Sequence, residues 1–306
     1  STTMTKIHAL PEVHVLRDAY RSEKAALLAA MKATGASTRG IRVLLRKLST
    51  LAGNLLQTLW QRAELPADMA LVAVGGFGRD QLFPYSDVDV LLLMPDGAAP
   101  EAGSALRTQL EGFIGSCWDA GLEIGSSVRT VAECLAESAG DVTVQTSLLE
   151  SRLVCGNAAL FEDFQRQYRT QMNPQAFLVA KTLEMRQRHN KYENTPYSLE
   201  PNCKESPGGL RDLQVILWVA RAAGLGHSWD ELARKGLATP LEARQIKANE
   251  ALLTLIRARL HLLANRREDR LVFDLQTAVA ESFGFKAQVP AVITAGPPGA
   301  PHVAPT

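Results

Sequence analysis

The sequence lacks the marks of a membrane, secreted or zinc-binding protein. No apolar run reaches the roughly 18 residues of a membrane-spanning helix, and no basic stretch followed by an apolar one forms a secretory leader. Only four cysteines occur, at positions 117, 134, 155 and 203, with no C-x-x-C pair and no histidine at zinc spacing. We therefore expect reduced thiols, no membrane partner and a cytoplasmic location.

An excess of charge of either sign is also missing. The 306 residues include 33 Lys and Arg and 32 Asp and Glu, and 46% of the residues are hydrophobic. A chain that binds nucleic acid by electrostatic attraction usually carries a marked basic excess. The composition therefore argues against a nucleic-acid partner and is typical of a globular protein with room for two domains.

What the chain does contain is a strand that begins with two alternating carboxylates. The segment D-V-D-V-L-L-L, residues 87–93, is predicted to be a buried strand, so Asp87 and Asp89 project from the same face. Two ionised carboxylates at this spacing repel each other and lose hydration unless a cation lies between them. Oxygen ligands suit Mg²⁺, or alternatively Mn²⁺, and protein-bound Mg²⁺ usually also contacts substrate phosphates. The pair therefore predicts a divalent metal and a phosphate-bearing substrate.

A glycine turn precedes the carboxylates. Residues 71–74 are predicted to form a short strand that leads into G-G-F-G, where Gly75 and Gly76 would let phosphates approach the backbone. Arg79 would add a guanidinium group for phosphate oxygens, and Ser86 would add a hydroxyl group. The segment lacks the Lys-Ser/Thr ending of a P-loop and the spacing of a dinucleotide-binding turn. Each feature alone is usually structural, but together and in this order they resemble the nucleotidyltransferase superfamily that includes DNA polymerase beta.

Hydrophobic periodicity around this motif predicts an α+β fold. Helical patterns flank short strand patterns between residues 65 and 157, and helical patterns then dominate. This predicts a polymerase-beta-like mixed sheet with flanking helices, followed by a mostly helical domain. The expected division is an N-terminal helical segment over 1–64, a nucleotidyltransferase domain over 65–157, a helical domain over 158–287 and a proline-rich, disordered or aberrant tail over 288–306.

The same patterns predict which helix faces are buried. Leucines at three- and four-residue steps predict a helix that Thr38 caps at its N-terminus. A helix that ends near residue 120 is predicted to place Trp118 on its apolar stripe. In a last long helix, over about 242–267, leucines that include Leu252 and Leu263 are predicted to face inward and the arginines outward.

The position of a third carboxylate, which polymerase-beta-like proteins commonly carry on a neighbouring strand, stays open. Glu123 and Glu150 are the two candidates. Each also has a plainer interpretation, because Glu123 fits a strand end at the surface and Glu150 fits an ion pair with Arg152.

The segment Y-S-L-E-P-N-C-K-E-S-P-G-G, residues 197–209, also has two interpretations. Its last two glycines precede an apolar helix, whose N-terminus would attract an anion near Lys204. Alternatively, the segment is a loop that turns the chain into that helix, and Lys204, Arg211 and Asp212 form ion pairs that anchor it.

Four ordered motifs together resemble one family, the bacterial PII uridylyltransferases. They are G-G-F-G-R-D-Q-L-F-P-Y-S-D-V-D, G-L-E-I-G-S-S-V-R-T, D-V-T-V-Q-T-S-L-L-E-S-R-L-V-C-G and N-C-K-E-S-P-G-G-L-R-D-L-Q. The resemblance, over about residues 15–287, implies Mg²⁺-dependent transfer of UMP from UTP to a tyrosine of the PII signal protein, with release of pyrophosphate. By position, the metal ligands would be Asp87 and Asp89, and the nucleotide would contact Gly75, Gly76, Arg79, Ser86 and Lys204.

The chain departs from the family in three respects. Family members continue into a His-Asp phosphohydrolase domain and paired ACT domains, but none of the six histidines here is followed by Asp. We therefore expect the uridylyl-removing and glutamine-sensing activities to be absent. Ser126 and Ser127 stand where relatives often have a histidine beside a serine, and the family pattern ends after Phe285. Alternative readings are an enzyme that uses ATP or another acceptor, and an inactive stub that binds PII or a nucleotide.

Overall fold

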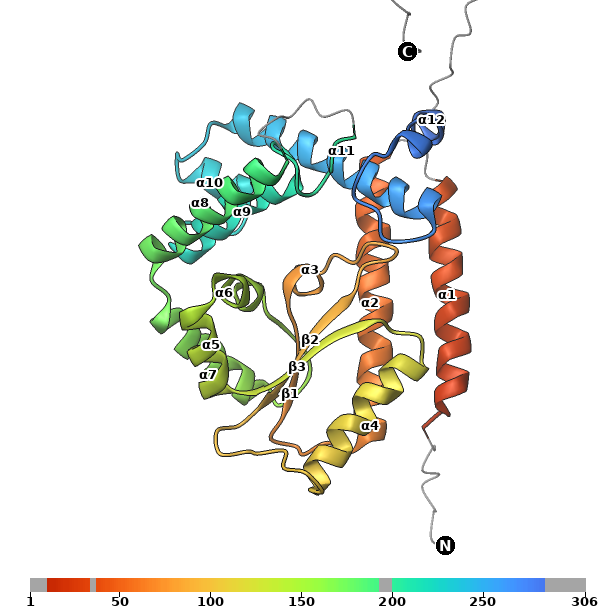
Figure 1. Cartoon of the computed structure of the whole chain (residues 1–306), viewed down its shortest axis with the longest axis vertical. Coiled ribbons are helices and arrows are strands. Elements are labelled where there is room, and N and C mark those ends of the chain that lie inside the picture. The colour runs from red at the N-terminus through yellow and green to blue at the C-terminus, as the bar shows by residue number, and fades with distance from the viewer. Residues whose placement is uncertain (1–9, 34–36, 193–199, 284–306) are drawn as a thin grey trace, which may run out of the picture.

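A four-stranded mixed sheet organises the chain (Figure 1). The structure is a computed structural model that describes residues 10–33, 37–192 and 200–283. The strands lie in the order β3-β2-β1-β4; β1 is antiparallel to both β2 and β4, and β2 is parallel to β3. Their bounds are Ala70–Ala73 for β1, Val88–Met94 for β2, Ile124–Thr130 for β3 and Arg152–Gly156 for β4.

Helices cover both faces of this sheet, and a further group lies beyond one end of it (Figure 1). One face packs against α1, α2 and α4, and the other against α5, α6 and α7. The bounds of these helices are Val13–Ala33 for α1, Thr38–Ala63 for α2, Gly75–Gly78 for the short α3, Ala105–Asp119 for α4, Val131–Gly140 for α5, Val142–Leu149 for α6 and Ala158–Gln171 for α7. The further group comprises α8 Pro174–Lys191, α9 Leu210–Ala222, α10 Trp229–Arg234, α11 Pro240–Ala264 and α12 Phe273–Ser282.

Side-chain alternation along β2 places its residues in two different cores. Val90 and Leu92 pack with the core formed by α1, α2 and α4, whereas Leu91 and Leu93 pack with the core formed by α5, α6 and α7. Because side chains in a strand alternate, Asp89 lies on the same face as Leu91 and Leu93. The sheet therefore aims this carboxylate toward the side of α6, at the end where α8 and α9 lie.

The predicted fold class is confirmed: a mixed sheet with flanking helices is followed by a mostly helical region. Among the described residues, no helix combines the length and hydrophobicity needed to cross a bilayer. The predicted tail over 288–306 and residues 197–199 of the predicted loop lie outside the described residues.

Three predictions about helices were wrong. Ser37, not Thr38, caps α2, because its backbone is extended and its Oγ accepts a hydrogen bond from the Gly40 amide at 3.0 Å. Trp118 is 53% exposed at the C-terminal end of α4, outside the buried stripe. In α11 the predicted inward face is right for Leu260, which is buried, but Leu252 and Leu263 are exposed, and the arginines Arg257 and Arg259 are buried instead of facing outward.

Candidate active site

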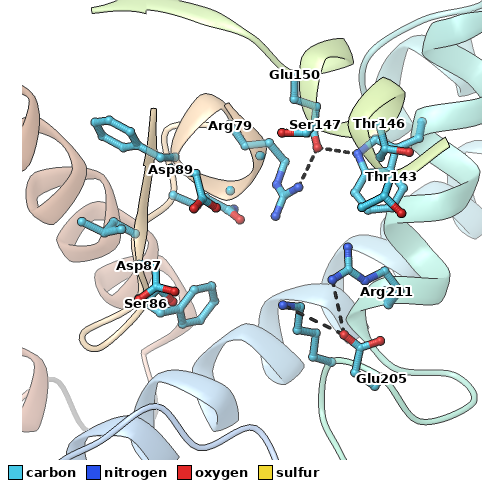
Figure 2. A pocket seen from close by; sticks show the side chains of 18 of the residues that line it. Arg79, Ser86, Asp87, Asp89, Thr143, Thr146, Ser147, Glu150, Glu205 and Arg211 are labelled. Atoms are coloured by element: carbon cyan, nitrogen blue, oxygen red, sulfur yellow. Dashed lines mark hydrogen bonds and ion pairs between the residues drawn. The ribbon is translucent and has the colours of Figure 1, made fainter. Parts of the chain in front are cut away.

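A cavity of about 540 Å³ lies between the sheet and the helices that follow it. The glycine segment, Ser86 and both aspartates line one side, and side chains from α6, α8, α9 and α11 line the remainder (Figure 2). The chain thus brings together residues that are more than 150 positions apart in the sequence. Every residue that the sequence predicted for the site lines this cavity, namely Gly75, Gly76, Arg79, Ser86, Asp87, Asp89 and Lys204.

The glycine segment forms a single helical turn, α3, directly after β1. Gly75 has φ of +59°, a conformation that costs glycine little and other residues much more. Arg79 follows this turn, and its Nη1 donates a hydrogen bond to Glu150 Oε1 at 2.7 Å. In Figure 2 the Arg79 side chain points into the cavity toward Glu150. The predicted guanidinium group is therefore present, and a carboxylate already holds it.

The two aspartates enter the cavity from the start of β2. Asp87 precedes the strand and is exposed, whereas Asp89 is the second residue of the strand and is half-buried. The Val88 amide between them donates to Glu123 O at 2.9 Å, which joins the start of β2 to the residue before β3. Asp87 pairs with Arg267 at 3.3 Å. The predicted common projection of the two carboxylates is confirmed, since both reach the same cavity.

Gly125 provides the space that the Asp89 carboxylate occupies. It is the direct partner of Asp89 in the parallel pairing of β2 with β3. A Cβ atom at this position would lie 2.5 Å from Asp89 Oδ1, well inside van der Waals contact. Only glycine leaves the carboxylate where it is, so Gly125 is a supporting residue that the sequence analysis did not identify.

The electrostatic environment of Asp89 disfavours its charged form until a cation is near. Burial raises the pKa of Asp89, and the neighbouring Asp87 raises it further, whereas Lys204 and Arg267 act in the opposite direction. The donors here are carboxylate oxygens, with the Ser86 hydroxyl beside them. Among the described residues, no group of three or more His, Cys, Asp or Glu side chains converges as a metal site. Two carboxylates nevertheless match the usual protein share of a Mg²⁺ site, in which water and substrate phosphates supply the other ligands.

The remaining wall of the cavity is rich in cations. Seven of the lining residues are Lys or Arg and five are Asp or Glu, an excess of two positive charges. Burial and the nearby Arg211 and Arg257 lower the pKa of one of these cations, Lys204, to about 8. The cationic lining residues are Arg79, Lys181, Arg188, Lys204, Arg211, Arg257 and Arg267.

The loop interpretation of the segment before α9 is confirmed for its described part. The Leu210 and Arg211 amides at the start of α9 donate to the carbonyls of Cys203 and Lys204, each at 2.8 Å. The chain itself therefore satisfies this helix N-terminus, and the predicted anion site there is wrong. Arg211 forms the predicted kind of anchoring ion pair, with Glu205 at 3.3 Å. The Lys204 side chain nevertheless lines the cavity.

Of the two candidate third carboxylates, the structure brings only Glu150 into the cavity. Glu150 is 5% exposed, and its Oε1 accepts hydrogen bonds from both Arg79 and the Trp218 indole. Glu123 is exposed and does not line the cavity. The predicted pair of Glu150 with Arg152 is wrong, since the Arg152 guanidinium donates to Phe77 O and Glu150 is held by Arg79.

Two cations of the far wall were not predicted from the sequence. Lys181 of α8 is 2% exposed, pairs with Glu184 at 2.9 Å and lies 4.7 Å from the centre of the Trp218 ring. Burial lowers the pKa of Lys181. Arg257 of α11, also buried, donates through Nε to Asp269 Oδ1 at 2.6 Å. Their inward orientation depends on acidic and aromatic partners that tertiary packing brings near.

Comparison with known proteins shows which proteins this chain is similar to. The sequence model of the family described as GlnD PII-uridylyltransferase matches residues 176–293, which include much of the cationic wall. A bifunctional uridylyltransferase/uridylyl-removing enzyme of Cupriavidus pinatubonensis is 57% identical over 271 residues, or 89% of this chain. The chain is related to the PII uridylyltransferases.

The similarity to these uridylyltransferases includes the carboxylate segment as well as the helical region. Proteins of the same name from Burkholderia mallei and Burkholderia pseudomallei are each 57% identical over 267 residues, or 87% of this chain. The chain spans about 30% of the length of all three relatives.

Proposed function

We propose that the chain transfers UMP from UTP to a tyrosine of the PII signal protein and releases pyrophosphate, with Mg²⁺, or alternatively Mn²⁺, as the cofactor. The observation that carries the proposal is the cavity, in which Asp87 and Asp89 face a wall of cations, two of which, Lys181 and Arg257, are buried. A triphosphate needs both the carboxylates and the cations, because the cations neutralise its charge while the carboxylates hold a metal near its α-phosphorus. The names of the relatives, uridylyltransferase/uridylyl-removing enzymes, support uridylyl as the transferred group.

In this proposal Asp87 and Asp89 hold the metal ion. The metal supplies neutralisation of phosphate charge and lowers the pKa of the attacking tyrosine hydroxyl. Asp87 would exchange its partner Arg267 for the metal, and the freed Arg267 guanidinium would be available to phosphate oxygens. Gly75 and Gly76 let the phosphates approach the backbone. The Ser86 hydroxyl donates a hydrogen bond to a phosphate oxygen.

The cationic wall stabilises the leaving group. Lys204 and Arg257 line the same cavity as the glycine segment, and in this proposal they stabilise the negative charge that grows on pyrophosphate during in-line displacement at the α-phosphorus. Arg79 contributes less directly, because Glu150 already neutralises it. In the proposal, the Arg79–Glu150 pair holds the part of the cavity wall beside the nucleotide in place.

The reaction is proposed for the cytoplasm, with neither nucleic acid nor a membrane as a partner. The four cysteines are free, and three of them, Cys117, Cys134 and Cys203, are buried. Burial raises the pKa of Cys117 and of Cys134 to about 12, so both thiols stay protonated at neutral pH. Such thiols suit a reducing compartment.

The test measures transfer of label from α-labelled UTP to PII in the presence of Mg²⁺. Parallel reactions use α-labelled ATP in place of UTP, and the variant Asp89→Asn in place of the wild type. The variant keeps the volume of the side chain and removes one charged ligand, so we expect a rate loss of about 10³-fold, equivalent to about 4 kcal/mol of transition-state stabilisation. The control is Asp68→Asn, which makes the same change at an exposed residue outside the cavity and should keep the wild-type rate.

Each other outcome identifies a different error. Full activity of Asp89→Asn would refute the metal site. Labelling from ATP rather than UTP would keep the transferase mechanism and replace the nucleotide. A folded wild-type chain that transfers no label from either nucleotide would favour a binding stub.

A further inference from the structure

The loop that presents Asp87 to the cavity is held by the end of α11 and the residues after it. Contacts occur at alternate loop residues. The Arg257 guanidinium lies 4.0 Å from the centre of the Phe83 ring, the Tyr85 amide donates to His261 Nδ1 at 3.3 Å, and Arg267 pairs with Asp87 at 3.3 Å. Residues about 180 positions later in the sequence therefore determine where the loop lies.

His261 is the central contact of the three and the most deeply buried. It is 0% exposed, and its Nε2 lies 3.2 Å from Asp269 Oδ1. An Nδ1 that accepts from a backbone amide carries no proton, so Nε2 carries the proton and donates it to the Asp269 carboxylate. Burial lowers the pKa of His261, which agrees with a neutral ring. The imidazole therefore has one defined tautomer.

The His261 ring contacts the loop through the Tyr85 amide, which donates a hydrogen bond to Nδ1. Pro84 before it has no N–H, and the Ser86 amide after it donates within the loop, to Phe83 O at 3.2 Å. The far end of the loop is fixed at Val88, whose amide donates to Glu123 O. A half-buried amide is stabilised by an acceptor, and here the acceptor is a buried ring in a helix. Without it, the loop would keep only the side-chain contacts of Phe83 and Asp87 with Arg257 and Arg267 as its links to the end of α11 and the residues after it.

We propose that His261 is a positioning residue: its Nδ1 holds the Tyr85 amide and so fixes the loop that presents Asp87 beside Asp89. The consequence for metal binding rests on the proposed function, whereas the positioning of the loop does not. A purely structural role would act through the other nitrogen, since Asp269 also binds Arg257 and its backbone O accepts from the Cys203 amide at 2.7 Å.

Two amide substitutions separate these roles, because each reproduces one nitrogen of the ring. His261→Asn places an amide oxygen near the position of Nδ1 and keeps the acceptor for Tyr85 while losing the bond to Asp269. His261→Gln places its amide near the position of Nε2 and keeps the bond to Asp269 while losing the acceptor. His14→Gln, at an exposed residue of α1, is the matched control.

The first measurement is hydrogen exchange of the Tyr85 amide in the metal-free, full-length chain. We expect it to be protected in the wild type, at least about tenfold faster in His261→Gln and within about threefold of the wild type in His261→Asn. The second measurement is Mn²⁺ affinity, followed by the electron paramagnetic resonance of free Mn²⁺. Loss of a residue that orients a metal ligand typically weakens binding by about 10- to 100-fold, which we expect for His261→Gln and not for His261→Asn.

Equal exchange rates of the Tyr85 amide in His261→Gln and His261→Asn would overturn the proposal. If the wild type binds Mn²⁺, equal Mn²⁺ affinities of the two variants would overturn its consequence for Asp87. If neither variant folds, an unprotected Tyr85 amide in the wild-type protein would overturn it. If the wild type binds no Mn²⁺ while His261→Gln alone releases the Tyr85 amide, the metal assignment fails and the positioning role stands.

Discussion

The substitution Gly125→Ala tests the geometry of the carboxylate pair without removing either carboxylate. The new Cβ would lie 2.5 Å from Asp89 Oδ1, whereas ordinary contact begins near 3.4 Å. The Asp89 carboxylate must therefore move by about 0.9 Å, and a displacement of about 1 Å at a reacting centre can cost about 100-fold in rate. The backbone should tolerate the change, because alanine in a strand is about 0.5–1 kcal/mol more favourable than glycine.

The assay measures the initial rate of UMP transfer and the melting temperature of the same sample. We expect the rate of Gly125→Ala to fall by about 100-fold while the melting temperature stays within a few degrees of the wild type. Gly112→Ala is the matched control, since a Cβ there meets no atom within 4 Å and α4 simply gains helix propensity. A wild-type rate in Gly125→Ala would refute the assigned place of Asp89 in the reaction.

Two further predictions concern the walls of the cavity. Lys204, whose pKa burial lowers to about 8, loses its positive charge as the pH rises through that value, so the KM for UTP should rise by about tenfold between pH 7 and 9. Lys204→Arg should keep its charge, so its KM for UTP should change little between pH 7 and 9. If the variant kept the wild-type pH dependence of KM, a group other than Lys204 would be the one that titrates. Glu150→Gln should lower the free energy of unfolding by about 2 kcal/mol, because the buried Arg79 and Trp218 donors lose a charged acceptor. The same change at the exposed Glu162 should stay within about 0.5 kcal/mol, and equal urea midpoints for the two variants would contradict the prediction.

The carboxylate side of the site was predictable because its signals are local. Alternation in the strand assigns Asp87 and Asp89 to one face, and the glycines of 75–78 stand directly after a strand. Neither inference depends on which helices pack against the sheet. The sequence therefore predicted the position of one wall of the cavity before the fold was known.

The cationic side was not predictable, because hydrophobic periodicity assigns charged residues to the outside of a helix. In α11 the inward face contacts a polar cavity as well as a core, so Arg257 is buried and Leu252 is exposed. Lys181 is buried for a similar reason, since Glu184 and the Trp218 ring replace its hydration. Glu184 is on the same helix as Lys181, but Trp218 belongs to α9, and only the tertiary structure shows that the ring and the ammonium group meet.

Two walls of the cavity come from distant parts of the chain, the segment 75–89 and the residues from 181 to 267, and residues 143–150 complete the lining. A nucleotide held between Asp89 and Lys204 would act as a removable cross-link between these parts. Since it binds only the assembled arrangement, its binding free energy adds to the stability of the whole molecule. Local opening of either part would release the nucleotide, so the sheet and the helical region would gain stability as one cooperative unit.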